Sequence, residues 1–214
     1  MSSLTRTAAK TRARYLLAEP TARFYTEANL NDWCNDAVSD ISLRSYCYQF
    51  KATPVTTTNG TSNYVWPISL NTTSINTIGV KTIVSSANLS FTRITPDLIG
   101  KVSQNPNEVC WCSWGREVIL SPTPTAAYSI TLFCWGEAEQ AGAGTLNLPQ
   151  PFHHLVPLYM AMRGFEAKRD IQMAMKYYEM YNNELNAITQ SWHIADNPGI
   201  DHVKPGVAGV TVGQ

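Results

Sequence analysis

The stretch TEANLNDWCNDAVSDI, residues 26–41, carries the clearest helix signal of the chain. Thr26 is a good N-cap, and Glu27 places negative charge at the positive end of the helix dipole. The apolar side chains that follow recur at spacings typical of one stripe of an amphipathic helix: Leu30, Trp33, Cys34, Ala37, Val38 and Ile41. We expect this helix to end between residues 43 and 46.

The pattern changes to that of strands after this helix. Thr, Val, Ile and aromatic residues dominate residues 48–135, interrupted by Gly, Pro and Asn. Asn59-Gly60 is the strongest hairpin signal, because both residues accept the positive φ of a tight turn. It predicts a hairpin between strands 50–58 and 62–68. Further hairpins are predicted to pair 78–84 with 89–95 and 108–114 with 117–121, before a last strand over 128–135. Thr95 is expected to cap a short helical turn within 96–103.

A Gly/Ala-rich connector leads through Leu148-Pro149 into a second helical region. Its apolar stripe comprises Phe152, Leu155, Val156, Tyr159, Met162 and Phe165. Pro157 lies inside this region, so either the helix is kinked there or its first turn is displaced. Asp170 is expected to cap a third helix, antiparallel to the second because the join is short. Its predicted stripe comprises Ile171, Met175, Tyr178, Tyr181 or Leu185, and Ile188.

The two ends of the chain differ from the body. Residues 1–23 are locally basic, because five Lys and Arg side chains stand against Glu19 alone. They are predicted to form an extension, either a solvated tail or an arm ordered by an acidic neighbour. Residues 192–214 are punctuated by Pro and Gly but carry spaced apolar residues, so this tail either stays disordered or adds a strand to a partner sheet.

The predicted fold class is α+β. A small helical bundle contains an inserted antiparallel β-domain and has extended N- and C-terminal arms. The predicted divisions are the basic extension 1–23, the first helix 24–47, the β-domain 48–136, the connector and helical hairpin 137–191, and the tail 192–214.

Composition favours a protein that packs against other subunits. Charged residues make up only 15% of the chain, below the roughly 25% typical of soluble domains, while 44% of residues are hydrophobic. A neutral polar surface suits close packing, where buried charges would need partners. The formal net charge is zero, which argues against binding nucleic acid through net positive charge. No apolar run approaches the length of a membrane-spanning helix, and no secretory signal is present.

Residue patterns that carry chemistry are scarce. His153-His154 is the most suggestive pair, but adjacent helical residues do not share a face and would not easily bind one metal ion. The five cysteines lack zinc-site spacing and are interpreted as small apolar core residues. No nucleophile elbow, P-loop or dinucleotide motif occurs. We therefore expect no catalytic residue, cofactor or metal. The alternative is a hydrolase that uses His153 or His154 with an acidic residue of the β-region.

Three stretches resemble the head–tail adaptor (connector) proteins of tailed bacteriophages. Residues 30–37, LNDWCNDA, resemble the first helix of that family. Residues 115–124, GREVILSPTP, resemble its apolar strand between a glycine and a Pro-x-Pro turn. Residues 146–155, LNLPQPFHHL, resemble its approach to the helical hairpin. The order of the three over residues 24–190 is more specific than any one of them. Pro157 and the basic residues 1–23 depart from the family pattern.

The resemblance implies a non-enzymatic virion protein of the head–tail junction, assembled in the host cytoplasm. Its implied partners are further copies in a ring of about twelve, the portal protein, tail or nozzle proteins, and passing genomic DNA without sequence specificity; no membrane is involved. Helix residues implied to pack the ring are Leu30, Trp33, Val38, Phe152, Tyr159 and Tyr178. Tail residues implied to contact the portal are Ile200, Val203, Val207, Val210 and Val212. Another neck or tail-completion ring protein is the alternative within this class.

Overall fold

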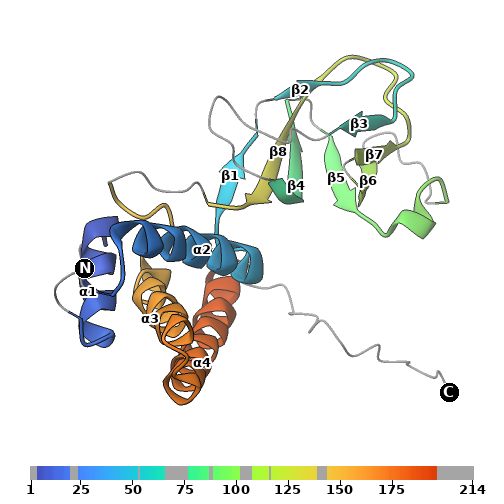
Figure 1. Cartoon of the computed structure of the whole chain (residues 1–214). Helices are drawn as coiled ribbons and strands as arrows, with labels where there is room; N and C mark the ends of the chain where they lie inside the picture. The colour runs from blue at the N-terminus through green and yellow to red at the C-terminus, as the bar shows by residue number, and fades with distance from the viewer. Residues whose placement is uncertain are drawn as a thin grey trace, which may run out of the picture.

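The computed structural model describes residues 4–19, 24–52, 54–65, 77–86, 89–101, 108–115, 117–138 and 144–196. The structure is α+β, as predicted, with helices gathered at one end and strands at the other (Figure 1). The helices in these residues are α1 Arg6–Leu16, α2 Glu27–Ser45, α3 Leu155–Ala167 and α4 Ile171–Asp196. All of the strands lie between α2 and α3 along the chain.

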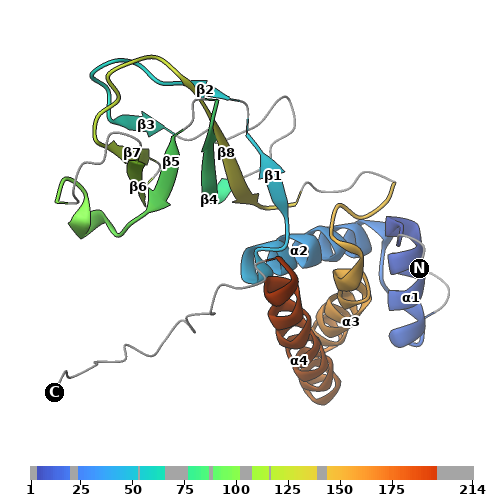
Figure 2. The same ribbon diagram turned by 180° about the vertical axis from the view of Figure 1, so that it is seen from behind.

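Helix α3 lies at the centre of the helical part. It contacts α1, α2 and α4, and it stands between α1 and α4 in both views (Figures 1 and 2). The core that these helices share is fully buried at Leu30, Phe152, Met160 and Tyr181. The helical part is therefore built around one central helix.

The expected limits of α2 are confirmed. The Thr26 hydroxyl accepts a hydrogen bond from the Asn29 amide, and the Asn29 side chain accepts one in return from the Thr26 amide. Tyr46 ends the helix in a left-handed conformation, with φ of 51°. The predicted stripe is the buried face of the helix, so capping and periodicity together located this element.

Pro157 is accommodated in the first turn of α3. The helix begins at Leu155, after a short 3-10 turn over Gln150–Phe152 (η2), so Pro157 is its third residue. The first amide groups of a helix have no partner within it, and a proline there removes no helical hydrogen bond. The alternative with a displaced first turn is the correct one. Asp170 also caps α4 as predicted, because its carboxylate accepts a hydrogen bond from the Met173 amide at 3.2 Å.

The strands form two sheets. Their bounds are β1 Gln49–Lys51, β2 Val55–Thr56, β3 Asn63–Val65, β4 Thr77–Ser85, β5 Ser90–Arg93, β6 Glu108–Trp114, β7 Glu117–Ser121 and β8 Ser129–Gly136. In the first sheet β8 pairs with β1, β2 and β4; the second has the order β3-β7-β6-β5. A second apolar core, which includes Trp111, Val118, Leu120 and Ile130, lies among these strands.

Strand pairing corrects two of the three predicted hairpins. The hairpin of β6 with β7 and the last strand β8 are confirmed. The Asn59-Gly60 turn, with Gly60 at φ of 77°, instead connects β2, which pairs with β8, to β3, which pairs with β7. β4 and β5 also join different sheets, and β5 runs parallel to β6, so the predicted purely antiparallel domain is wrong on this point. The turn at Pro96–Leu98 (η1) forms without a side-chain cap from Thr95.

The predicted N-terminal extension is wrong over residues 6–16, which form α1. Thr5 caps this helix, and Ala9 and Ala13 are fully buried in the helical core. The predicted start of the C-terminal tail at residue 192 is also wrong, because α4 continues to residue 196. Trp192 packs edge-on against Phe152, with 5.7 Å between the ring centres, so this part of α4 belongs to the helical core.

Candidate functional site

The two histidines serve structural roles. His153 is buried, its Nδ1 accepts a hydrogen bond from the Leu4 amide at 2.9 Å, and its Nε2 lies 2.8 Å from the Leu148 carbonyl. With Nδ1 accepting, Nε2 is the nitrogen that donates to that carbonyl. Both ring nitrogens are thereby used to fasten the N-terminal segment to the approach to α3. His154 pairs with Glu184 of α4 at 2.6 Å on the surface. The hydrolase alternative requires His153 or His154 to lie beside an acidic residue of the strands. Among the described residues, neither histidine does so.

Cysteine and metal chemistry find no support in the described residues. All five cysteines are free and buried, in keeping with their interpretation as core residues. Burial raises the pKa of the Cys47 and Cys134 thiols to about 11, which keeps them protonated and poorly nucleophilic at neutral pH. The described ranges contain no group of three or more His, Cys, Asp or Glu arranged to hold a metal ion. No helix there is long and apolar enough to cross a membrane.

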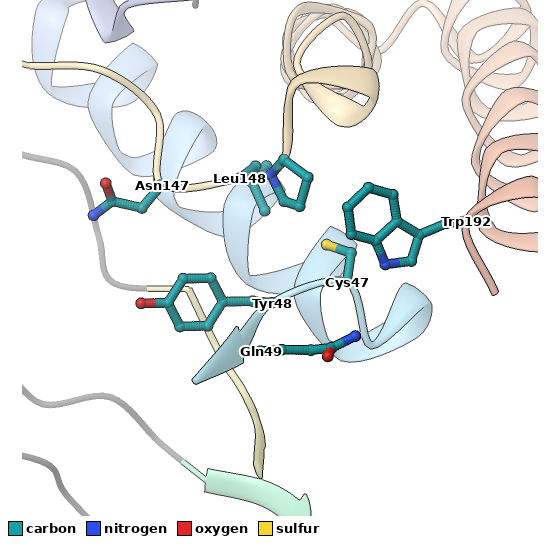
Figure 3. A pocket seen from close by; sticks show the side chains of 7 residues that line it. Cys47, Tyr48, Gln49, Asn147, Leu148 and Trp192 are labelled. Carbon is teal, nitrogen blue, oxygen red and sulfur yellow. The ribbon is translucent and has the colours of Figure 1, made fainter. Parts of the chain in front are cut away.

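A hollow of about 580 Å³ lies where the helices meet the strands (Figure 3). Its lining comes from Cys47, Tyr48 and Gln49 after α2, from residues 147–149 and from Trp192 of α4. These described lining residues include no carboxylate or imidazole, so the hollow offers apolar and hydrogen-bonding contacts without an acid–base pair.

Helix α1 is held by ion pairs to the same chain. Arg14 donates to Glu27 at 2.9 Å and lies 3.8 Å from the buried Glu19, while Lys10 donates to Glu27 at 2.7 Å. These two cations lower the pKa of the Glu27 carboxyl, chiefly through their hydrogen bonds. The sequence left open whether an acidic neighbour orders the basic segment. That neighbour is the start of α2, so these basic side chains serve the fold.

Most residues predicted to pack the ring lie inside the chain's own core. Leu30, Trp33, Val38 and Phe152 are buried among the four helices, and Tyr159 is half-buried against Tyr181. Their side chains are therefore occupied before any second subunit arrives. Any contact between copies of this chain would need exposed residues instead.

An exposed apolar stripe on α4 supplies such residues. Ile171, Met175 and Tyr178 follow one another at helical spacing and are 60%, 58% and 54% exposed. The α4 side chains buried in the core are instead Ala174, Tyr177, Tyr181 and Leu185. The predicted α4 stripe thus mixed two faces of the helix. The sequence did carry a signal for the buried face: Ala174 and Tyr177 lie between the exposed residues and repeat at the same helical spacing.

The class to which this chain belongs is that of the bacteriophage head–tail adaptors, which are structural proteins of the virion. The family model described as SU10 adaptor protein matches residues 5–200, and the chain belongs to this family. The resemblance drawn from the sequence is thereby confirmed. The match includes α1, to which the sequence had given no family counterpart. No curated protein matches the chain.

Membership in this family makes the chain a virion component that interacts with other head or tail proteins. The residues predicted to contact the portal, between Ile200 and Val212, lie outside the described residues.

Proposed function

We propose that this chain is one subunit of a ring that docks under the portal and links the capsid to the tail around the DNA channel. The observation that carries the proposal is the apolar stripe Ile171–Met175–Tyr178, left open on a member of an adaptor family. A helix that has already completed its own core gains nothing within the subunit from three further exposed apolar residues. A neighbouring subunit would cover them.

The stripe favours association with a neighbouring copy. Covering apolar area contributes roughly 25 cal/mol per Å² removed from water, before the cost of association. A contact between two different faces repeats from subunit to subunit and yields a closed ring when the rotation closes. Tyr178, one of the residues implied to pack the ring, lies on this stripe.

The C-terminal segment is the proposed link to the portal. Residues 197–214 follow α4 directly and carry Ile200, Val203, Val207, Val210 and Val212. Each binding event costs translational and conformational entropy, and many copies acting together offset this cost through multivalency. DNA passes through the ring without sequence-specific contacts, consistent with the zero net charge of the chain.

Native mass spectrometry of the full-length protein with the portal of the same phage tests this proposal. The full-length protein should form a complex with several adaptor copies per portal ring. A variant lacking residues 197–214 should keep the thermal unfolding curve of the parent and lose portal binding. Undiminished portal binding by the truncated protein would refute the role of the tail. Assembly on a tail protein but not on the portal would place the ring elsewhere in the neck.

A further inference from the structure

Two rows of side chains meet at a corner between α2 and α4. Along α2, residues Asp32, Asp36, Asp40 and Arg44 follow at four-residue spacing and so share one side of the helix. Along α4, the stripe Ile171–Met175–Tyr178 continues one turn later to Asn182. The rows touch where Arg44 Nη2 donates to Asn182 Oδ1 at 2.7 Å. We name these residues of α2 and α4 the corner surface.

The corner surface has an acidic edge and an apolar edge. Near the apex, Asp40 accepts a hydrogen bond from the Tyr181 hydroxyl at 2.5 Å and lies 3.4 Å from Arg44. Farther along α2, Asp32 and Asp36 are exposed and have no ion-pair or hydrogen-bond partner among the described residues. Two unpaired carboxylates one turn apart on α2 and the apolar stripe on α4 together suit a partner that carries a cation and an aromatic or aliphatic group.

Helix α1 carries the complementary side chains on its outer side. Thr11, Arg12 and Tyr15 are exposed on the side of the helix that faces away from the buried Ala9 and Ala13. Arg12 is exposed and has no partner among the described residues, whereas Lys10 and Arg14 are used within the chain. Tyr15 is 70% exposed, one turn after Thr11. We name Thr11, Arg12 and Tyr15 the α1 surface.

We propose that the α1 surface of one copy binds the corner surface of the next copy, with Arg12 between Asp32 and Asp36 and Tyr15 on the stripe Met175–Tyr178. This inference rests on the proposed ring function and specifies which faces meet. Helices α1 and α4 lie on different sides of α3, and α2 contacts both of them (Figures 1 and 2). Because the two surfaces are different and complementary, each copy offers one of each, which is the requirement for a head-to-tail ring.

A second copy is favoured as the occupant because the charges match within one chain. One unpaired cation faces outward on α1, and two unpaired carboxylates face outward on α2. Beside these charges, the corner surface offers the apolar stripe of α4 and the α1 surface offers the ring of Tyr15. A partner of another kind would leave one of these two surfaces without a binding site.

Charge reversal and charge exchange test the pairing, with the full-length protein assembled on its portal. Arg12→Glu alone and Asp32→Lys with Asp36→Lys should each weaken assembly at least about tenfold, because like charges then face each other. The triple variant that combines all three changes should regain assembly, because opposite charges face each other again. Lys176→Glu, an exposed charge reversal on α4 outside the stripe, is the matched control and should assemble like the parent. Copies per portal ring are counted by native mass spectrometry.

Each result decides between the two proposals. Normal assembly by Arg12→Glu or by the double aspartate variant would overturn the pairing and leave the ring function standing. Loss of assembly in both, without recovery in the triple variant, would also overturn it, since the faces would then serve different partners. Complete rings of Arg12→Glu that fail to attach to the portal would assign the α1 surface to the portal instead. Failure of the parent protein to assemble on its portal would refute the proposed function itself.

Discussion

Gly164 allows α1 and its following loop to lie close to α3. A Cβ atom at this position would lie 2.5 Å from Cδ2 and 2.8 Å from Cδ1 of the buried Leu17. On the same turn, the Gly164 carbonyl accepts a hydrogen bond from the Tyr25 hydroxyl at 2.7 Å. Burial, with a smaller contribution from Glu19, raises the pKa of Tyr25 to about 12, so this hydroxyl stays protonated and continues to donate. One glycine thus supports two contacts of the N-terminal segment.

Gly164→Ala should lower the free energy of unfolding by about 1–2 kcal/mol, because Leu17 must leave its position. This loss should appear although alanine favours a helix over glycine by about 1 kcal/mol. In a Leu17→Ala background the same change should stabilise the protein, because the obstructing side chain is gone. Urea denaturation of the four proteins measures both effects. An equal effect of Gly164→Ala in the two backgrounds would show that Leu17 is not the cause.

At the scale of elements, α1 shows how a basic segment becomes part of a core. Its buried side is small, formed by Ala9 and Ala13, and its charged side chains reach over to Glu19 and Glu27. Ala13→Asp should place an unpaired charge in this contact and lower the free energy of unfolding by about 3 kcal/mol. Thr11→Asp, on the exposed side of the same helix, should change it by less than about 0.5 kcal/mol. Similar stability of the two variants by chemical denaturation would mean that α1 does not pack on the core.

Local signals in the sequence located the elements that local interactions determine. Thr26 and the apolar stripe act within α2, and Asp170 acts within α4. The predictions built on them hold. The Asn59-Gly60 turn is equally local, but which strands it serves depends on β7 and β8, more than 50 residues farther along the chain. Strand partners are chosen by packing across the sheets, which a turn motif does not encode.

The candidate surfaces were harder to predict than the fold class. Tyr178 and Tyr181 both fit a helical stripe, but only Tyr181 is buried, because it packs against Tyr159 of α3 and donates a hydrogen bond to Asp40 of α2. In the same way, Arg12 and Arg14 look alike in the sequence. Glu19 and Glu27 neutralise Arg14, while Arg12 remains on the outer side of α1. Whether a residue serves the fold or a partner follows from contacts between elements distant in the sequence.

At the scale of the whole molecule, two apolar cores are joined by a narrow set of contacts. The helical core and the strand core share no buried residue. Contacts between them include the Gly136 amide donating to the Tyr48 carbonyl at 3.0 Å, the Ala138 amide donating to the Ser42 hydroxyl at 3.1 Å, and the edge-on rings of Tyr46 and Trp135. Such a boundary favours partly independent stability of the two parts.

Substitutions in one core should therefore leave the amide groups of the other core protected from hydrogen exchange. Phe152→Ala, in the helical core, should cost about 3–5 kcal/mol and accelerate amide exchange in α1 to α4, while β6, β7 and β8 keep their protection. Leu120→Ala, in the strand core, should do the reverse. Hydrogen exchange read by mass spectrometry on peptides from each part distinguishes the two. Equal acceleration throughout the molecule by either variant would mean that both cores unfold as one cooperative unit. Independent cores would allow the helices to be fixed in the proposed ring while the strands adjust to a neighbouring protein.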